Sequence, residues 1–319
     1  MFRLAFVVLA LAACGSGNPQ QNSTVDAPVG TNPDAHHTTP DGTVTGAVDP
    51  ADDGSAMVTD STVSIPGATS AHTLAATIYR PSGVTAPALV VISPGFQMDR
   101  TQYTSFAHHL ATWGFVVILT DYADKGFFAS HQLMADDLGA VISYALAPAF
   151  TPAIDAAKIA LVGHSLGGDI SVLAASADPR VKAVVGWDPV DGSSPSVVPE
   201  KMTTFTAKLA VIGEITDSSG GAACAPAAQN FTKFYASAPS PAYQRTVVGA
   251  DHMDWVDDGT CPLCTLCTAG TASPDLAHKT TRRLNVAWLR AQLFGDATMT
   301  PWLMAPPEVM AGTASVTTK

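Results

Sequence analysis

The sequence predicts an α/β fold with a mostly parallel central sheet, helices on both faces of the sheet, and little or no lid. Two observations carry this prediction. Short, nearly continuous apolar segments alternate with segments of helical spacing through residues 54–297. Within that region, an apolar run at 159–162 passes through Gly-His-Ser-Leu-Gly at 163–167 into a small-residue run at 168–175, as a strand, a sharp turn and a helix would.

The individual elements follow from hydrophobic spacing. Apolar and β-branched runs predict strands at residues 73–79, 88–93, 115–120, 158–162, 181–187, 209–213 and 244–248. Apolar residues spaced three and four apart predict helices at residues 103–113, 132–146, 168–175, 225–236 and 275–293. Strands that are apolar on both faces and separated by helices belong in a parallel sheet that is covered on both sides.

The pentapeptide at 163–167 predicts a nucleophilic serine. A G-x-S-x-G motif is weak by itself, but between a buried strand and a helix it places the serine at the apex of a strained turn. Small neighbours matter there, because the chain passes close to adjacent backbone. We therefore expect Ser165 to be the nucleophile.

A serine nucleophile needs a base, an acid that orients the base, and donors for the oxyanion. His252 follows the last predicted strand of the parallel set, which makes it the candidate base. Two carboxylates are candidates for the acid: Asp188 ends the strand at 181–187, and Asp217 follows the strand at 209–213. Either loop can face the loop of His252 in a parallel sheet, so spacing alone leaves this choice open.

The oxyanion hole is expected from two backbone amides. One is the amide of Phe96, in the Ser-Pro-Gly-Phe segment at 93–96 that ends an early strand, and the other is the amide of Leu166. Phe96, Trp187, Met253 and Trp255 are expected to line an open apolar substrate cleft, although Trp187 and Trp255 are equally compatible with the core. No metal or organic cofactor is required by this chemistry.

The N-terminus reads as a targeting segment rather than a fold element. Arg3 precedes an apolar run that is too short to span a bilayer and that ends in Leu-Ala-Ala-Cys at 11–14. This resembles a bacterial lipobox, so residues 1–13 are expected to be a lipoprotein signal peptide and Cys14 the lipidated residue; an ordinary signal peptide is the alternative. The expected location is the cell envelope, anchored through that lipid, or the secreted fraction.

Composition divides the rest of the chain. Residues 14–53 are polar and acidic and predict a disordered tether, residues 54–297 the catalytic domain, and residues 298–319, rich in Pro, Met and Thr, a loosely ordered tail. With 319 residues, 47% of them hydrophobic, the chain is long enough for one large core. Its net charge of −11 disfavours nucleic acid as a partner. A monomer is expected.

Four cysteines remain in the exported part of the chain: Cys224, Cys261, Cys264 and Cys267. In an oxidising compartment they predict two disulfides, with the pairing left open. The alternatives are a zinc site formed by all four thiolates and a thiol-redox motif at Cys261 and Cys264. The carboxylates at residues 251, 254, 257 and 258 are interpreted as solvated loop charges rather than as a calcium site.

Several motifs resemble known families. The segments at 93–96, 112–117 and 163–168 resemble the α/β-hydrolase superfamily, both its chlorophyllase and dienelactone-hydrolase-like branch and, more loosely, bacterial cutinases and polyester hydrolases. Asp-Pro-Val-Asp-Gly at 188–192, Cys-Ala-Pro at 224–226 and Asp-His-Met-Asp at 251–254 resemble chlorophyllases specifically. Chlorophyllase resemblance implies Asp188 as the acid and cutinase resemblance implies Asp217; the more numerous chlorophyllase-like features favour Asp188.

The sequence thus predicts a serine carboxylesterase acting on short-to-medium acyl esters or polyesters. A chlorophyllase-like hydrolase of a large alcohol ester is an alternative. Leu166 after the serine, the lipoprotein start and the cysteine-rich loop depart from plant chlorophyllases and disfavour chlorophyll itself as substrate. A non-catalytic surface-binding protein on the same scaffold is disfavoured by the complete set of serine, acid and histidine.

Overall fold

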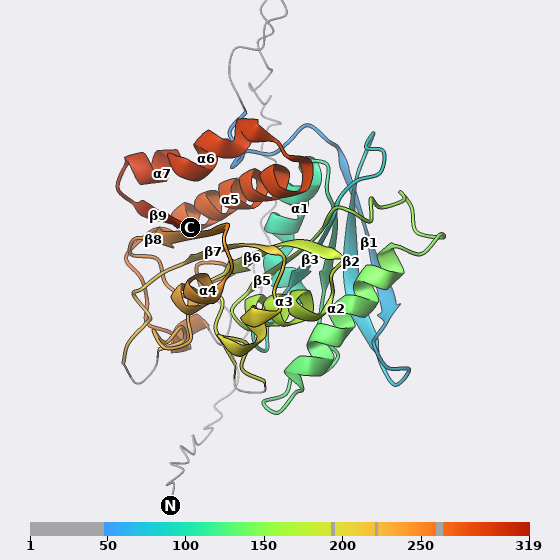
Figure 1. The fold of residues 1–319 in the computed structure, drawn as a ribbon, viewed down its shortest axis with the longest axis horizontal. Coiled ribbons are helices and arrows are strands. Elements are labelled where there is room, and N and C mark those ends of the chain that lie inside the picture. The colour runs from blue at the N-terminus through green and yellow to red at the C-terminus, as the bar shows by residue number, and fades with distance from the viewer. Residues whose placement is uncertain (1–47, 193–194, 221–222, 260–263) are drawn as a thin grey trace, which may run out of the picture. The chain divides into compact units, whose positions relative to one another are not determined.

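One nine-stranded mixed sheet organises the part of the chain that the computed structural model describes, which is residues 48–192, 195–220, 223–259 and 264–319 (Figure 1). The strand order is β1-β2-β4-β3-β5-β6-β7-β8-β9. The strands are β1 (Val58–Pro66), β2 (Thr73–Pro81), β3 (Leu89–Ser93), β4 (Val116–Thr120), β5 (Ile159–His164), β6 (Val181–Trp187), β7 (Lys208–Gly213), β8 (Ala242–Val247) and β9 (Ala314–Thr318). The six strands from β4 to β8 in this order are mutually parallel, and β1, β2 and β9 are antiparallel to their neighbours.

Helices cover both faces of the sheet. The α-helices are α1 (Thr104–Thr112), α2 (His131–Ala145), α3 (Leu166–Ala177), α4 (Phe231–Ser237), α5 (Pro274–Phe294), α6 (Thr300–Met304) and α7 (Pro307–Met310). Short 3-10 helices are η1 (Arg100–Tyr103), η2 (Glu200–Thr203), η3 (Cys264–Leu266) and η4 (Ala297–Met299). In Figure 1, α5 and α1 lie on one side of the parallel strands, and α2, α3 and α4 lie on the other. This is the predicted α/β architecture.

The central strands alternate their side chains between two hydrophobic cores. In β3, Leu89 and Val91 pack with the core under α2, α3 and α4, whereas Val90 and Ile92 pack with the core under α1 and α5. All five residues of β3 are buried. A strand that is buried on both faces needs an apolar residue at every position, which is why these strands are recognisable as continuous apolar runs.

The C-terminal 22 residues do not form the loosely ordered tail that composition predicts. They contribute α6, α7 and β9, and β9 pairs antiparallel with β8 from Tyr243↔Thr318 to Val247↔Ala314. Glu308 is buried and forms ion pairs with Arg245, at 2.8 Å, and with Arg283. Backbone pairing and a buried ion pair order this segment. Neither interaction requires a periodic pattern of apolar residues, so the sequence of the segment does not reveal them.

The compact unit also begins earlier than expected, at Val48 instead of residue 54. Asp49 forms a two-pronged ion pair with Arg283 of α5, with nitrogen–oxygen distances of 2.8 and 2.7 Å. The expected signal peptide, Cys14 and the expected tether up to residue 47 lie outside the described residues. Within the described residues, no helix is both long enough and apolar enough to cross a bilayer.

Two further elements differ from the prediction. The edge strand β1 was not expected, because half of its residues are exposed and polar. Helix α4 begins at Phe231 and not at residue 225, since the side chain of Asn230 accepts the amide of Thr232 at 3.2 Å and caps the helix there. Residues 223–230, which include Cys224, therefore form turns and bends before the helix.

Candidate active site

Ser165 occupies a strained turn between β5 and α3. Its φ of 53° and ψ of −120° are unusual for a residue with a side chain. The turn needs glycine on both sides: a Cβ on Gly163 would lie 2.2 Å from the backbone of Gly167, and one on Gly167 would lie 2.2 Å from the carbonyl of Ser93. These contacts give the physical reason for the small residues of the motif.

His252 and Asp188 complete a continuous chain of hydrogen bonds with Ser165. The Nε2 atom of His252 lies 2.9 Å from Ser165 Oγ, and its Nδ1 atom lies 2.6 Å from Asp188 Oδ2. A carboxylate oxygen can only accept, so Nδ1 carries the proton and Nε2 of the neutral ring accepts from the serine hydroxyl. This is the arrangement that a serine nucleophile and its base require.

The three side chains meet because the strands that precede them are parallel and end at the same edge of the sheet. Ser165 follows β5, Asp188 follows the neighbouring strand β6, and the His252 loop follows β8, two places further along the sheet. Asp188 itself has a φ of 40°, and its amide donates to the carbonyl of Ile212 in β7 at 2.6 Å. A second strained residue is therefore held beside the histidine by the next strand.

Asp217, the other candidate acid, makes different contacts. Its Oδ2 atom accepts the amide of Cys224 at 3.0 Å, and its own amide donates to Glu214 Oε2 at 2.8 Å. The Asp217 side chain has no hydrogen bond to His252 among the described contacts, although it is completely buried. Of the two carboxylates, the structure brings only Asp188 into contact with the histidine.

Three buried carboxylates thus lie behind His252: Asp188, Glu214 and Asp217. Burial lowers the pKa of His252, but the hydrogen bond to Asp188 and its charge outweigh burial, so the pKa lies above its usual value. Burial, together with the negative charge of Asp188, raises the pKa of Glu214 to about 8. Glu214 is therefore protonated at neutral pH, which limits the negative charge gathered behind the imidazole.

The backbone amides of Phe96 and Leu166 follow the ends of β3 and β5, and Phe96 and Ser165 line the same cleft. Leu166 is the first residue of α3, where a helix amide has no partner within the helix. The amide of Phe96 has no hydrogen-bond partner among the described residues, while the preceding carbonyl of Gly95 accepts the amide of Met98 at 3.1 Å. Two unpaired donors beside a serine suit an oxyanion hole.

An apolar cleft of about 260 Å³ opens over Ser165 and His252. Its walls include Phe96, Met98, Phe127, Met253 and Leu266, together with the disulfide described below. The rings of Phe96 and Phe127 meet edge to face with their centroids 5.3 Å apart. At the mouth of the cleft, Phe127 is 76% exposed and Leu266 is 62% exposed, so the cleft stays open to solvent and its rim is apolar.

The expectation that Trp187 and Trp255 line this cleft is wrong. Both side chains are completely buried in the core beneath α1 and α5. Each indole N–H is satisfied there, by Asn285 Oδ1 for Trp187 and by Thr281 Oγ1 for Trp255, both at 2.9 Å. Large aromatic residues next to a motif are often core residues, and here hydrogen-bond partners in α5 hold both indoles inward. Met253 and Phe96 do line the cleft.

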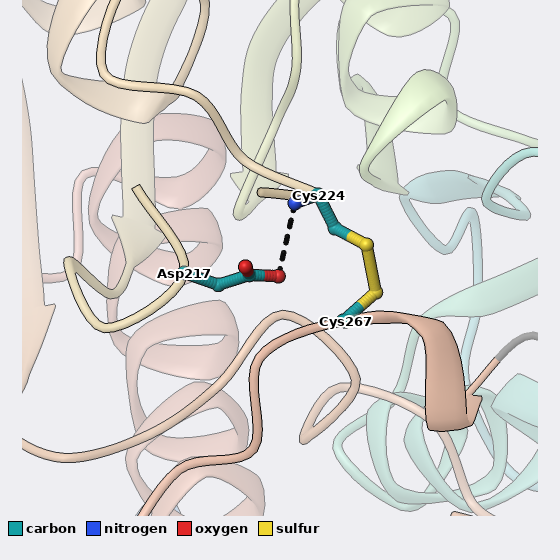
Figure 2. A group of neighbouring side chains, drawn as sticks. All are labelled: Asp217, Cys224 and Cys267. Atoms are coloured by element: carbon teal, nitrogen blue, oxygen red, sulfur yellow. Dashed lines mark hydrogen bonds between the residues drawn. A yellow bond between two sulfur atoms is a disulfide. The ribbon is translucent and has the colours of Figure 1, made fainter. Parts of the chain in front are cut away.

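Cys224 and Cys267 form a disulfide that links the loop after β7 to the loop after His252 (Figure 2). Both cysteines also line the cleft. Cys264 is disulfide-bonded as well, and Cys261 lies outside the described residues. A crosslink between loops on both sides of the histidine restricts the unfolded chain and holds the cleft wall in place.

The disulfide weighs against the zinc alternative. Among the described residues, the one group close enough to hold a metal ion is Asp217 with Cys224 and Cys267, and Figure 2 shows the two sulfurs joined to each other. A cysteine binds zinc as a thiolate, and the sulfurs of a disulfide are not thiolates. In this oxidised state the group offers one carboxylate, which already accepts the Cys224 amide.

The acidic residues around His252 serve the loop itself. Asp251 accepts the amides of Met253 and Gly270 at 2.9 and 2.7 Å, and Asp254 accepts the amide of Asp251 at 3.0 Å. Asp254 is buried, so it is not the solvated charge that the sequence suggested. These bonds fold the loop tightly after β8 and fix where the histidine emerges.

Four contributors to the site escaped sequence reasoning. His164 precedes the serine and Glu214 follows a predicted strand, but no sequence pattern marks either as functional. Phe127 and Leu266 come from loops that have no hydrophobic periodicity. The sequence signal for Phe127 was the adjacent pair Phe127-Phe128 in a mostly polar segment, and the structure shows that both side chains are exposed. Apolar side chains that are exposed together often mark a binding site.

Several known ester hydrolases are similar to this chain in sequence. Cutinase est1 of Thermobifida alba is 26% identical over 234 residues, which cover 72% of this chain and 69% of that protein. A cutinase of Thermobifida fusca (strain YX) is 25% identical over 236 residues, or 72% and 68% of the two chains. Chlorophyllase-1, chloroplastic, of Citrus sinensis is 26% identical over 244 residues, covering 69% and 73%.

These relatives support an ester hydrolase with the α/β-hydrolase fold. The family model described as Chlorophyllase matches residues 47–314, which is most of the chain and nearly the whole of the compact unit. The chain therefore belongs to the chlorophyllase family.

Proposed function

We propose that this protein is an exported serine carboxylesterase that works through an acyl-enzyme intermediate. The observation that carries the proposal is the unbroken hydrogen-bond chain from Ser165 through His252 to Asp188 at the floor of an apolar cleft. A serine hydroxyl, a neutral imidazole with the correct tautomer and a buried carboxylate form the combination that activates a serine toward an ester carbonyl.

Each residue has one role in the proposed reaction. Ser165 Oγ attacks the ester carbonyl while His252 Nε2 takes its proton, and the imidazolium is stabilised by Asp188. The amides of Phe96 and Leu166 donate to the oxyanion. His252 returns the proton to the departing alcohol; water then attacks the acyl group with His252 as base, which releases the acid and restores the serine.

The cleft supports an apolar acyl group or polyester segment of modest size. Its lining includes two phenylalanine, two methionine and one leucine side chains and two disulfide-bonded cysteines, and its volume is about 260 Å³. Its open, apolar mouth also tolerates a large alcohol group, which keeps a chlorophyllase-like substrate as the second candidate; Citrus sinensis chlorophyllase-1 is the relative that favours it.

A series of esters tests this proposal. We expect p-nitrophenyl butyrate and octanoate to be hydrolysed faster than the palmitate, because a long chain exceeds the cleft and leaves apolar surface in water. A second series keeps the acyl group as butyryl and varies the alcohol of the ester from methanol to a bulky aromatic alcohol. A steep preference for the bulky alcohol would favour the second candidate, and no hydrolysis of any ester would contradict the proposal.

Lipid anchoring through Cys14 is a separate part of the proposal and is supported by the sequence around that residue. We expect radiolabelled palmitate to be incorporated into the full chain expressed in a bacterial host, and to be absent from the Cys14→Ser variant. Labelling that persists in Cys14→Ser, or no labelling of the unaltered chain, would contradict anchoring at this residue and leave the esterase proposal untouched.

A further inference from the structure

Beneath the candidate active site lies a buried pair of polar side chains, Tyr103 of η1 and His164 at the end of β5. We propose that Tyr103 and His164 are positioning residues that hold the oxyanion loop and the His252 loop in fixed relation to each other. This proposal rests on the proposed esterase function. It assigns to Tyr103 and His164 the role of orienting the Phe96 amide, which is the candidate oxyanion donor of that esterase.

The donor and acceptor of each hydrogen bond in this pair can be assigned from the His252 carbonyl oxygen. The carbonyl oxygen of His252 lies 2.9 Å from His164 Nε2 and can only accept, so Nε2 carries the proton. In the neutral ring Nδ1 is then an acceptor, and it receives the hydroxyl proton of Tyr103 at 2.9 Å. The Tyr103 oxygen in turn accepts the amide of Gly95 at 3.0 Å.

The environment keeps both groups in these protonation states. Burial lowers the pKa of His164 well below its usual value, so the ring stays neutral. Burial raises the pKa of the Tyr103 hydroxyl, which stays protonated. The hydrogen-bond chain from Gly95 to His252 therefore has a single arrangement at the pH at which the enzyme works.

This chain controls the peptide units of the oxyanion loop. The carbonyl of Pro94 and the amide of Gly95 are the two ends of one planar peptide unit. Tyr122 donates its hydroxyl to that carbonyl at 3.1 Å, and Tyr103 accepts that amide, so the unit is held at both ends. The following unit ends in the amide of Phe96, which is the candidate oxyanion donor, and a rotation of the first unit would re-aim it.

The oxyanion loop packs closely against both side chains. A Cβ placed on Gly95 would lie 3.0 Å from His164 Nδ1 and 3.2 Å from the Tyr103 oxygen. The rings of His164 and His252 lie with their centroids 4.8 Å apart. Tyr103 and His164 thus form a pair that contacts both the loop that would stabilise the oxyanion and the loop that carries the base.

Tyr103→Phe tests this role, with Tyr243→Phe as its matched control. Tyr243 is equally buried, and its hydroxyl donates to the carbonyl of Leu303 at 2.6 Å, on β8 away from the cleft. For Tyr103→Phe we expect kcat for p-nitrophenyl butyrate to fall about 10- to 100-fold with KM within about twofold, somewhat less than complete loss of one oxyanion donor would cost. Tyr243→Phe should lower thermal stability and leave kcat within about twofold.

A boronic acid inhibitor separates positioning from general stability. It binds serine hydrolases as a tetrahedral anion on the serine, so its inhibition constant should rise in Tyr103→Phe by about the same factor as kcat falls. In Tyr243→Phe that constant should stay unchanged. Inhibitor binding that is unaffected in Tyr103→Phe would overturn the positioning role.

A second pair of variants covers the possibility that Tyr103→Phe does not fold. His164→Gln retains one amide donor and one acceptor, whereas His164→Leu has neither; we expect His164→Gln to keep at least about tenfold more kcat. Equal kcat in the two would overturn the inference. If Ser165→Ala is inactive while Tyr103→Phe has the same kcat as Tyr243→Phe, the positioning role fails and the esterase proposal stands. If Ser165→Ala is fully active, the esterase proposal itself fails.

Discussion

Replacement of Ser165 by alanine should reduce the turnover of p-nitrophenyl esters by about three orders of magnitude or more, the scale on which serine hydrolases lose activity without their nucleophile. The hydroxyl is the atom that becomes covalently bonded to the acyl group, and no other described hydroxyl hydrogen-bonds His252 Nε2. The remaining groups, an oxyanion hole and a base, would retain only weak catalysis by water.

Ser176→Ala provides the control. Ser176 lies at the far end of the same helix, α3, where its hydroxyl donates to the carbonyl of Leu173 at 2.7 Å. It is far along the helix from the cleft, so we expect its kcat to stay within about twofold of the unaltered protein. Hydrolysis that persists in Ser165→Ala at the level of Ser176→Ala would end the serine esterase proposal.

The parts of the fold that could be predicted are those in which local pattern and tertiary structure agree. Strand β3 is apolar at every position because both of its faces are buried, and the turn at Ser165 requires glycines because backbone lies 2.2 Å from where their side chains would be. Such signals are local, and they can be read without knowledge of what packs against them.

The parts that were missed depend on partners distant in the sequence. Strand β9 is ordered by pairing with β8, and Glu308 finds Arg245 and Arg283 only after the sheet has formed. The indole of Trp187 is drawn inward by Asn285, which is 98 residues away. No local sequence pattern predicts such contacts, because they form between segments that come together only in the tertiary structure.

The choice between the two candidate acids shows the same limit within the site. Asp188 and Asp217 each follow a parallel strand, so their sequence contexts are equivalent. What distinguishes them in the structure is the strained backbone of Asp188, which points its carboxylate at His252, and the Cys224 amide, which occupies Asp217. Neither feature is visible in the spacing of residues.

Asp188→Asn is therefore expected to lower kcat by about four orders of magnitude, the loss seen when an orienting carboxylate becomes an amide. An asparagine at this position can present an N–H to Nδ1, which favours the wrong tautomer and places a proton on Nε2, where Ser165 needs an acceptor. Asn has nearly the same shape as Asp, so the backbone at this strained position has little reason to change. Steady-state hydrolysis of p-nitrophenyl butyrate measures the effect.

Asp217→Asn is the matched control, since it makes the same change at an equally buried aspartate. Its side-chain oxygen still accepts the amide of Cys224, so we expect a loss of kcat of less than about tenfold. If Asp217→Asn lost most of its kcat and Asp188→Asn lost little, the assignment of Asp188 would be wrong and Asp217 would be the acid that orients the base.

The pH profile adds an independent readout of the same pair. Protonated His252 cannot accept the serine proton, so kcat/KM should fall as the pH decreases through the His252 pKa, which Asp188 holds above 6.5 in the unaltered protein. Asp217 contributes to this elevation less than Asp188 does, through its charge alone. The acidic limb of the residual activity should therefore move to lower pH in both variants, and further in Asp188→Asn, when hydrolysis is followed by pH-stat titration. An acidic limb that stays in place in Asp188→Asn would mean that another carboxylate sets the proton affinity of the base.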